Sequence, residues 1–276
     1  MKIARALVET TERLTEAGCD TPRVDAELLV AHVLGLARSQ LVLESSRKLS
    51  REEKKGLDRL VTRREAREPL AYVLGEWGFR HLLLGVDRRV LVPRPETEIV
   101  VDRCLARLAG RDEPCVLDVG TGSGAIALAL ADEHPGARVT AIDASTGALE
   151  VAGANAARAG LALELREWDL FYGLPDGPWD LVVSNPPYVL PEEIDGLEPE
   201  VRDWEPQEAL VGTGATEAVV RGAVDVLREG GALVLEVAAG DAPRVASLLE
   251  ALGYADVTTT RDLADRDRVV EGVRAV

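Results

Sequence analysis

One short motif, Asn185-Pro186-Pro187-Tyr188, contains the residue types best suited to chemistry. It follows residues 180–183, an apolar run that predicts a buried strand, and the two prolines end that strand and stiffen the loop. The side-chain oxygen of Asn185 and the carbonyl of Pro186 can accept the two hydrogens of a planar NH2 group. Such a nitrogen is a poor nucleophile because its lone pair is delocalised. Holding both hydrogens favours its attack on a methyl group, while Tyr188 stacks on the planar group. The alternative is a proline-ended loop with a packed tyrosine.

A glycine-rich turn lies between a predicted strand at residues 115–119 and a predicted helix that begins at residue 125. The turn consists of Gly120, Thr121, Gly122, Ser123 and Gly124. Glycines in a strand-to-helix turn permit tight backbone geometry and close approach of a ligand. The GxGxG spacing differs from the GxGxxG of dinucleotide sites, and a dinucleotide site would leave the Asn185 loop without a role.

An acidic residue follows each of the next two predicted strands. Asp143 lies about 20 residues after the glycine turn, where a carboxylate can accept both hydroxyls of a ribose. Asp169 lies just beyond a predicted strand at residues 161–165, where it can accept a hydrogen of an adenine amino group while Leu170 covers the ring. The alternative for Asp169 is a capped turn with aromatic side chains in the core. Because the carboxyl ends of parallel strands meet at one edge, we expect the glycine turn, both acids and Asn185 in one crevice.

The elements that must position these residues alternate between strands and helices, which is typical of an α/β fold with a parallel sheet. The last two predicted strands, residues 254–260 and 268–273, form a closing antiparallel pair. Such a hairpin distinguishes a seven-stranded methyltransferase sheet from a plain dinucleotide-binding sheet. We therefore predict a Rossmann-like class I methyltransferase domain over residues 95–276, with an irregular lid at residues 192–208.

The N-terminal part of the chain has a different pattern. Residues 1–74 predict a small helical domain, in which Ser50 and Glu53 fit a capping box. Residues 75–94 predict a linking hairpin, with strands at 79–84 and 89–92. The helical domain carries no catalytic group, so it either serves as a packing unit or binds a macromolecular substrate.

Composition narrows the class of protein. The 276 residues carry a formal net charge of −16, which disfavours binding of nucleic acid over a whole face, and 46% are hydrophobic, enough for a core. The cysteines predict buried, reduced thiols, and the histidines lack metal-ligand spacing, so we predict no metal site. No signal peptide and no apolar run of about 20 residues is found, which predicts a soluble cytoplasmic protein. The three cysteines are Cys19, Cys104 and Cys115, and the three histidines are His32, His81 and His134.

Three segments together resemble the release-factor glutamine methyltransferases, the HemK/PrmC type. They are residues 92–98 (Val-Pro-Arg-Pro-Glu-Thr-Glu), residues 118–124 and residues 185–188. The resemblance covers nearly the whole chain. The Asn-Pro-Pro-Tyr motif alone is shared with adenine-N6 DNA methyltransferases and ribosomal-protein glutamine methyltransferases, whereas Pro-Arg-Pro-Glu-Thr-Glu points to the release-factor branch.

The resemblance implies S-adenosylmethionine as methyl donor and methylation of the side-chain amide nitrogen (N5) of glutamine in the Gly-Gly-Gln motif of peptide release factors. By this likeness the glycine turn holds the methionine end of the cofactor, Asp143 its ribose, and Asp169 and Leu170 border its adenine. The loop from Asn185 to Tyr188 holds the glutamine amide, and Asn185 is also expected to contact the cofactor. Some family members carry Trp where this chain has Leu170, so only a hydrophobic wall is implied there.

Several alternatives stay open at this point. The substrate could be a glutamine of a ribosomal protein or an adenine N6 of nucleic acid, although the net charge and the lack of a target-recognition region count against the latter. A cofactor-binding adaptor, in which the helical domain carries the function, is a third alternative. As partners we expect release factors, with no direct binding of nucleic acid or membrane, and we expect a monomer.

Overall fold

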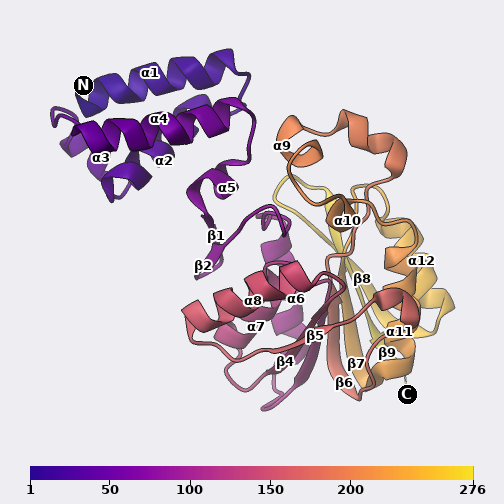
Figure 1. Cartoon of the computed structure of the whole chain (residues 1–276). Coiled ribbons are helices and arrows are strands. Elements are labelled where there is room, and N and C mark those ends of the chain that lie inside the picture. The colour runs from indigo at the N-terminus through magenta and orange to yellow at the C-terminus, as the bar shows by residue number, and fades with distance from the viewer. Residues whose placement is uncertain (276) are drawn as a thin grey trace. The chain divides into compact units, whose positions relative to one another are not determined.

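The computed structural model describes residues 1–275, which form two compact units (Figure 1). The first consists of Met1–Glu76 together with Glu198–Trp204, and the second contains Trp77–Leu197 and the chain from Glu205 onward. The sequence predicted that residues 95–276 form one domain throughout. The structure differs at residues 198–204, which group with the helical unit.

The helical unit is built from amphipathic helices around a small core of its own. Its helices are α1 (Ile3–Glu16), α2 (Pro22–Leu34), α3 (Gln40–Leu43), α4 (Arg51–Glu65), α5 (Leu70–Leu74) and α9 (Pro199–Arg202). Leu14, Leu29 and Val61 are among the apolar side chains that the helices bury between them. The predicted capping box at the start of α4 is confirmed: the Glu53 N–H donates to Ser50 Oγ at 3.1 Å, and the Ser50 N–H donates to Glu53 Oε2 at 2.7 Å.

A buried ion cluster explains why α9 belongs to this unit. Glu200 on α9 accepts hydrogen bonds from Arg64 Nη1 at 2.7 Å and from Arg67 Nη2 at 2.6 Å. Arg64 also donates from Nε to Asp25 Oδ2 at 2.8 Å. Burial by itself would raise the pKa of Glu200, but the hydrogen bonds from Arg67 and Arg64 hold it below its usual value. The cluster therefore ties a segment from the C-terminal half of the chain to helices near its N-terminus.

The first strand of the linking hairpin begins three residues earlier than the sequence predicts. Its strands are β1 (Glu76–Phe79) and β2 (Leu82–Gly85), so the predicted strands at 79–84 and 89–92 are wrong. The turn is made by Arg80, whose φ of 52° is left-handed. The Arg80 N–H donates to Glu98 Oε1 at 2.9 Å, and its guanidinium Nε donates to Glu133 Oε1 at 2.7 Å. These contacts with distant residues hold a turn that local sequence does not signal.

The second unit contains the predicted seven-stranded sheet. Its strands are β3 (Cys115–Val119), β4 (Arg138–Asp143), β5 (Glu164–Glu167), β6 (Trp179–Ser184), β7 (Leu227–Glu236), β8 (Tyr254–Arg261) and β9 (Asp267–Arg274). Their order is β5-β4-β3-β6-β7-β9-β8, and β9 alone runs in the opposite direction to the other six strands. The predicted fold class and its terminal antiparallel hairpin are confirmed. Strand β5 begins later than predicted, because Leu161 N–H still donates to Ala156 O at 3.1 Å to close the preceding helix.

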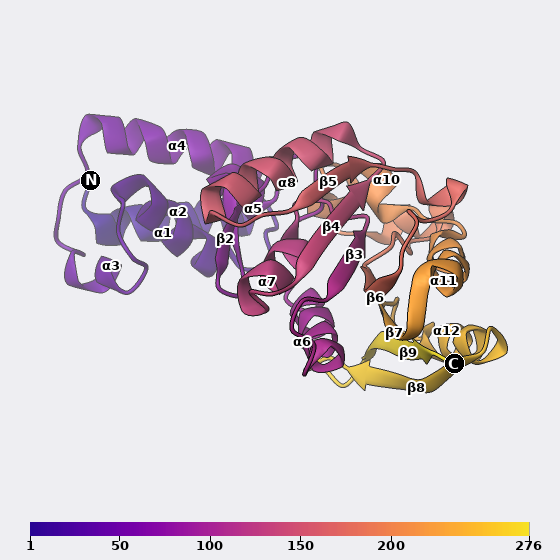
Figure 2. The same ribbon diagram turned by 90° about the horizontal axis from the view of Figure 1, so that it is seen from below.

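Helices cover both faces of this sheet (Figure 2). Those on one face are α6 (Thr97–Leu108), α7 (Ala125–Glu133) and α8 (Thr146–Ala159), and those on the other are α11 (Ala215–Val226) and α12 (Ala242–Ala251). Leu181 and Val183 of β6 pack on the first face and Val182 on the second. A strand buried on both faces is apolar throughout, which is why the strands read as continuous hydrophobic runs.

The predicted irregular lid consists of short helical turns. They are η2 (Pro191–Gly196), α9 and α10 (Gln207–Leu210), and a further turn, η1 (Leu170–Tyr172), follows β5.

The three cysteines are free thiols, of which Cys19 and Cys104 are buried and Cys115 is half-buried, so the prediction of burial is wrong for Cys115.

The ion cluster predicts the effect of removing Glu200. Glu200→Ala leaves Arg64 and Arg67 without their shared acceptor in a site where the Arg64 side chain is 6% exposed. We expect a loss of roughly 1–3 kcal/mol in the free energy of unfolding of the helical unit, measured by urea denaturation.

Glu198→Ala is the matched control. The Glu198 side chain is 64% exposed and lies 3.5 Å from Arg67, so its removal should cost less than about 0.5 kcal/mol. Equal losses for the two variants would contradict the role given to Glu200.

Candidate active site

The pairing of β3 with β6 brings the predicted site residues to one edge of the sheet. Strands β4 and β5 intervene in the sequence but lie on the far side of β3, so the strand order reverses between β3 and β6. In that pairing Val119 is opposite Ser184, and the Ser184 hydroxyl donates to Val119 O at 2.7 Å. Gly120 and Asn185 therefore leave neighbouring strands at the same level. Ligands of open α/β sheets bind at such a reversal point.

The same register aligns the acidic residues with this point. Val119 is opposite Ile142 of β4, so Asp143 follows at the level of Gly120. On the other side, Ser184 is opposite Leu235 of β7, which places Glu236 beside Asn185. The structure thus brings together the glycine turn, Asp143 and Asn185 as predicted, and adds Glu236.

The glycine turn leaves open space in front of its backbone. Gly120, Gly122 and Gly124 have φ values of 73°, 55° and 82°, a region that disfavours other residues. A Cβ atom added to Gly120 or Gly122 would meet no atom within 4 Å, whereas one added to Gly124 would lie 3.3 Å from Ala152 Cβ. The first two glycines are therefore suited to close approach of a ligand, and the third to packing between α7 and α8.

Asp143 braces this turn from the neighbouring strand. Its Oδ2 accepts the Gly122 N–H at 2.9 Å, and its Oδ1 accepts the Ser145 N–H at 2.9 Å. Burial raises the pKa of the Asp143 carboxyl, and these two hydrogen bonds oppose that rise. Each carboxylate oxygen keeps a second lone pair, so both can still accept a ligand hydroxyl.

Asp118 is a buried acid beneath the turn to which the sequence reasoning gave no separate role. Its Oδ2 accepts the Thr121 hydroxyl at 2.7 Å, but its Oδ1 has no partner among the described residues. Burial raises the pKa of Asp118 to about 7. A buried acceptor without a donor is rare in proteins and indicates a place for a polar or cationic ligand group.

Asp169 caps the turn η1, which is the alternative that the sequence left open. Its Oδ1 accepts the Phe171 N–H at 2.9 Å. The aromatic side chains of that turn are not in the core, because Phe171 is 63% exposed and Tyr172 is 87% exposed. Leu170 packs partly against the core on the α11 face. The expected role of Asp169 and Leu170 beside an adenine stays a prediction.

The Asn-Pro-Pro-Tyr loop is held on several sides. Asn185 is half-buried, and its Nδ2 lies 3.3 Å from Thr97 Oγ1. A Cβ atom added to Gly212 would lie 1.9 Å from Pro187 O, so only glycine fits behind the loop. Burial raises the pKa of the Tyr188 phenol. The loop therefore presents its polar atoms from a fixed backbone.

Thr97 and Glu236 are two buried groups near the loop that had no role of their own in the sequence-based prediction. The Thr97 hydroxyl lies 2.6 Å from Glu236 Oε2, and burial raises the pKa of Glu236. The signal for Glu236 was present, since it is an acid at the end of an apolar strand, as Asp143 is.

Arg94 donates from Nη2 to both oxygens of the buried Glu205, at 2.8 and 2.7 Å, and so ties the Pro-Arg-Pro segment to the lid.

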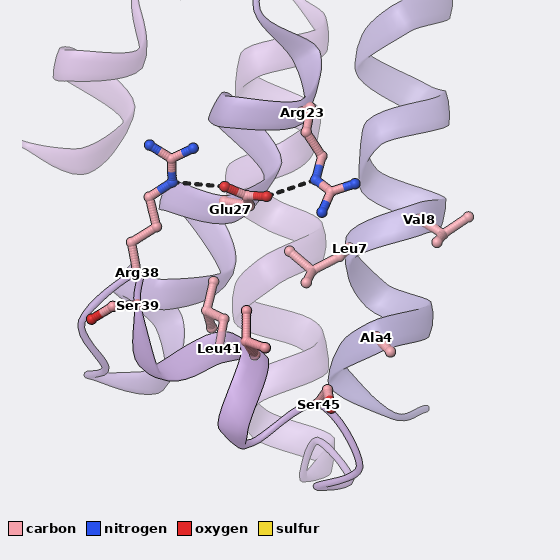
Figure 3. A pocket seen from close by; sticks show the side chains of 10 residues that line it. Ala4, Leu7, Val8, Arg23, Glu27, Arg38, Ser39, Leu41 and Ser45 are labelled. Atoms are coloured by element: carbon pink, nitrogen blue, oxygen red, sulfur yellow. Dashed lines mark hydrogen bonds and ion pairs between the residues drawn. The ribbon is translucent and has the colours of Figure 1, made fainter.

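A separate hollow of about 750 Å³ lies in the helical unit and contains none of these residues (Figure 3). Leu7 and Leu41 are among its apolar lining residues, and Glu27 stands at its rim between two arginines. Glu27 accepts from Arg23 Nε at 2.6 Å and from Arg38 Nε at 2.7 Å. The lining also contains Val8, Val42 and the hydroxyl groups of Ser39 and Ser45.

Residues 1–275 contain neither a cluster of metal-ligating side chains nor a helix that could span a membrane. Within this range no group of three or more histidine, cysteine or acidic side chains could hold a metal ion. None of the helices that the structure describes is long and apolar enough to cross a membrane.

Comparison with known proteins covers both units. Residues 5–75 match the family described as PrmC N-terminal domain, and residues 98–196 match the family described as Methyltransferase small domain. The chain is 40% identical to the release factor glutamine methyltransferase of Caulobacter vibrioides, over 99% of this chain and 97% of that protein. It is 42% identical to the enzyme of the same name from Cereibacter sphaeroides, over 98% of each chain.

Solved structures with a similar fold are more distant in sequence. A methyltransferase from Pyrococcus furiosus superposes with a TM-score of 0.52 at 18% identity, over 70% of this chain and 89% of that one. A ribosomal protein L11 methylase from Lactobacillus delbrueckii gives 0.50 at 22% identity, over 71% and 96%. These likenesses agree with the class I methyltransferase fold of the second unit.

The raised pKa of Asp118 predicts how stability depends on pH. From about pH 4 to pH 7 the unfolded carboxyl is ionised while the buried one keeps its proton, so stability falls as pH rises. Without added ligand, the free energy of unfolding should fall between pH 5 and pH 7 by about 2 kcal/mol more in the wild type than in Asp118→Asn.

Asp265→Asn is the control, because its side chain is 84% exposed. It should leave the pH dependence of unfolding unchanged. If Asp118→Asn follows the wild-type curve as well, burial of the Asp118 carboxyl does not shift its titration.

Proposed function

Because the chain belongs to the family of release factor glutamine methyltransferases, we propose that it methylates the side-chain amide nitrogen (N5) of glutamine in the Gly-Gly-Gln motif of peptide chain release factors. The methyl donor is S-adenosylmethionine. The observation that carries the proposal is the pairing of β3 with β6, because the glycine turn and the Asn-Pro-Pro-Tyr loop follow these two neighbouring strands at the same level.

The residues at this edge fit the cofactor. The open space before Gly120 and Gly122 would take its methionine end, and the unpartnered Asp118 oxygen suits an ammonium group. We assign Thr121, Ser123 and Gly124 to the same turn, Asp143 to the ribose, and Asp169 and Leu170 to the adenine. When bound, S-adenosylmethionine supplies a methyl group attached to a positively charged sulfur.

The chain's own residues act by holding the substrate amide. Asn185 Oδ1 and Pro186 O each accept one hydrogen of the glutamine NH2, which fixes the nitrogen and favours the positive charge that grows on it. Pro187 stiffens the loop, and Tyr188 packs on the amide and excludes water. The methylated nitrogen then releases one proton to water. No strong base is required, which fits a loop without histidine or lysine.

Methyl transfer with labelled S-adenosylmethionine tests the proposal. A purified release factor should take up label on the Gly-Gly-Gln glutamine, located by mass spectrometry, and a factor with that glutamine changed should take up none. Asn185→Ala should lower turnover by roughly 100-fold or more, because it removes one of the two acceptors, while the Kd for S-adenosylmethionine stays largely unchanged.

Two outcomes would count against this reading. Label that enters a ribosomal protein or DNA in place of the release factor would move the substrate to a related methyltransferase branch. Equal loss of cofactor binding and turnover in Asn185→Ala would remove the substrate-holding role from Asn185.

The helical unit is proposed as the part that binds the body of the release factor. In support, the groove of Figure 3 exposes apolar side chains to solvent, with Val42 78% exposed and Val8 55% exposed. Adjacent exposed apolar residues on a small domain are typical of a docking surface for protein.

A cytoplasmic monomer is expected, since release factors act in translation and free buried thiols such as Cys104 suit a reducing compartment.

A charge placed in the groove tests this assignment. Val42→Glu should raise the KM for the release factor roughly tenfold, because docking would bury the new carboxylate, and should leave kcat at saturating release factor unchanged. The control is Leu263→Glu, since Leu263 is likewise an exposed apolar residue but belongs to the second unit. Unchanged KM in Val42→Glu would exclude this groove from substrate binding.

A further inference from the structure

Three side chains from distant parts of the chain form a continuous line of hydrogen bonds. They come from the loop after β6, the first residue of α6 and the last residue of β7. Asn185 Nδ2 lies 3.3 Å from Thr97 Oγ1, and Thr97 Oγ1 lies 2.6 Å from Glu236 Oε2. Thr97 is 5% exposed and Glu236 is 1% exposed, so water does not compete for these groups.

The direction of these bonds follows from counting hydrogens. A threonine hydroxyl has one hydrogen to donate and two lone pairs that can accept. The Thr97 hydroxyl donates to Glu236 Oε2 at 2.6 Å, so its single hydrogen is taken by Glu236. The oxygen of Thr97 can then only accept. Asn185 must therefore turn its NH2 group toward Thr97, and its carbonyl oxygen lies on the other side of the planar amide.

This orientation matters because the two ends of an asparagine amide have nearly the same shape. Packing alone distinguishes them poorly, and the hydrogen-bond partners decide which end points where. With its oxygen toward the substrate, Asn185 can accept a hydrogen from a planar NH2 group. With the amide reversed, its own NH2 would face the substrate NH2, and neither group could accept.

We propose that Thr97 and Glu236 are positioning residues that orient the Asn185 amide, so that its oxygen is presented to the substrate nitrogen. This inference rests on the proposed function of Asn185. It gives a role to Thr97 in the Pro-Arg-Pro-Glu-Thr-Glu segment and to the acid at the end of β7. Neither residue touches the substrate in this scheme, and both act through Asn185.

The test compares variants that differ in the hydroxyl at position 97. Thr97→Val keeps the shape of the side chain and removes the hydroxyl, whereas Thr97→Ser keeps the hydroxyl. We expect Thr97→Val to lower kcat roughly 10- to 100-fold, the usual effect of losing a group that orients an active-site residue. The KM for release factor and the Kd for S-adenosylmethionine should stay within about twofold, and Thr97→Ser should keep most of the kcat.

If Thr97→Val folds poorly, Thr97→Ala takes its place. It removes the same hydroxyl with a smaller side chain, and we expect the same loss of kcat. Thermal unfolding of each variant separates misfolding from loss of orientation. Wild-type kcat in a folded variant that lacks the hydroxyl would overturn the proposal. So would a Thr97→Ser variant that loses as much kcat as Thr97→Val.

The wild type in the same assay separates this inference from the proposed function. If wild-type label enters an acceptor other than the release factor, the proposed substrate fails. The comparison of Thr97→Val with Thr97→Ser then continues on that acceptor, because Asn185 would present its oxygen to any planar NH2 group in the same way.

Discussion

The pairing of β3 with β6 is the constraint on which the rest of the site depends. A parallel pair has a fixed register, and here it aligns the last residues of two strands that lie far apart in the sequence. Gly120, Asp143, Asn185 and Glu236 all lie at the level set by that pair. A shift of one residue in the pairing would turn the buried side chains of β6 to the opposite face, so the two apolar clusters hold the register in place.

Buried acids are the second feature that organises the molecule. The chain is strongly acidic overall, yet several carboxylates are buried or half-buried, and they differ in the partners that offset the cost of burial. Glu200 and Glu205 meet arginines, which ties chain segments to one another. Glu236 accepts a hydrogen bond from the Thr97 hydroxyl, and one oxygen of Asp118 has no partner among the described residues. The acids with structural partners hold the frame, and those with incomplete or neutral partners lie at the candidate site.

The loop after β6 shows how a rigid frame becomes useful for chemistry. A planar amide can be recognised only by acceptors in a fixed geometry, since both of its hydrogens lie in one plane. Two prolines, a closely packed glycine behind Pro187, and the hydrogen bond to Thr97 all restrict Asn185 and its neighbours. Such pre-organisation suits a reaction in which positioning, rather than proton transfer, supplies most of the rate.

The sequence by itself determined the order of strands and helices, the glycine turn, the acid after β4 and the Asn-Pro-Pro-Tyr loop. These features are local, because apolar runs, prolines, glycines and caps act within a few residues. Apart from the pairing of β8 with β9, tertiary structure alone decided which strands are neighbours, and so placed Glu236 beside Asn185. It also decided the left-handed turn at Arg80 and the grouping of residues 198–204 with the helical unit, since both depend on ion pairs between residues far apart in the chain. The physical reason is that a charged side chain finds its partner only after the backbone has folded, and no local pattern records that partner.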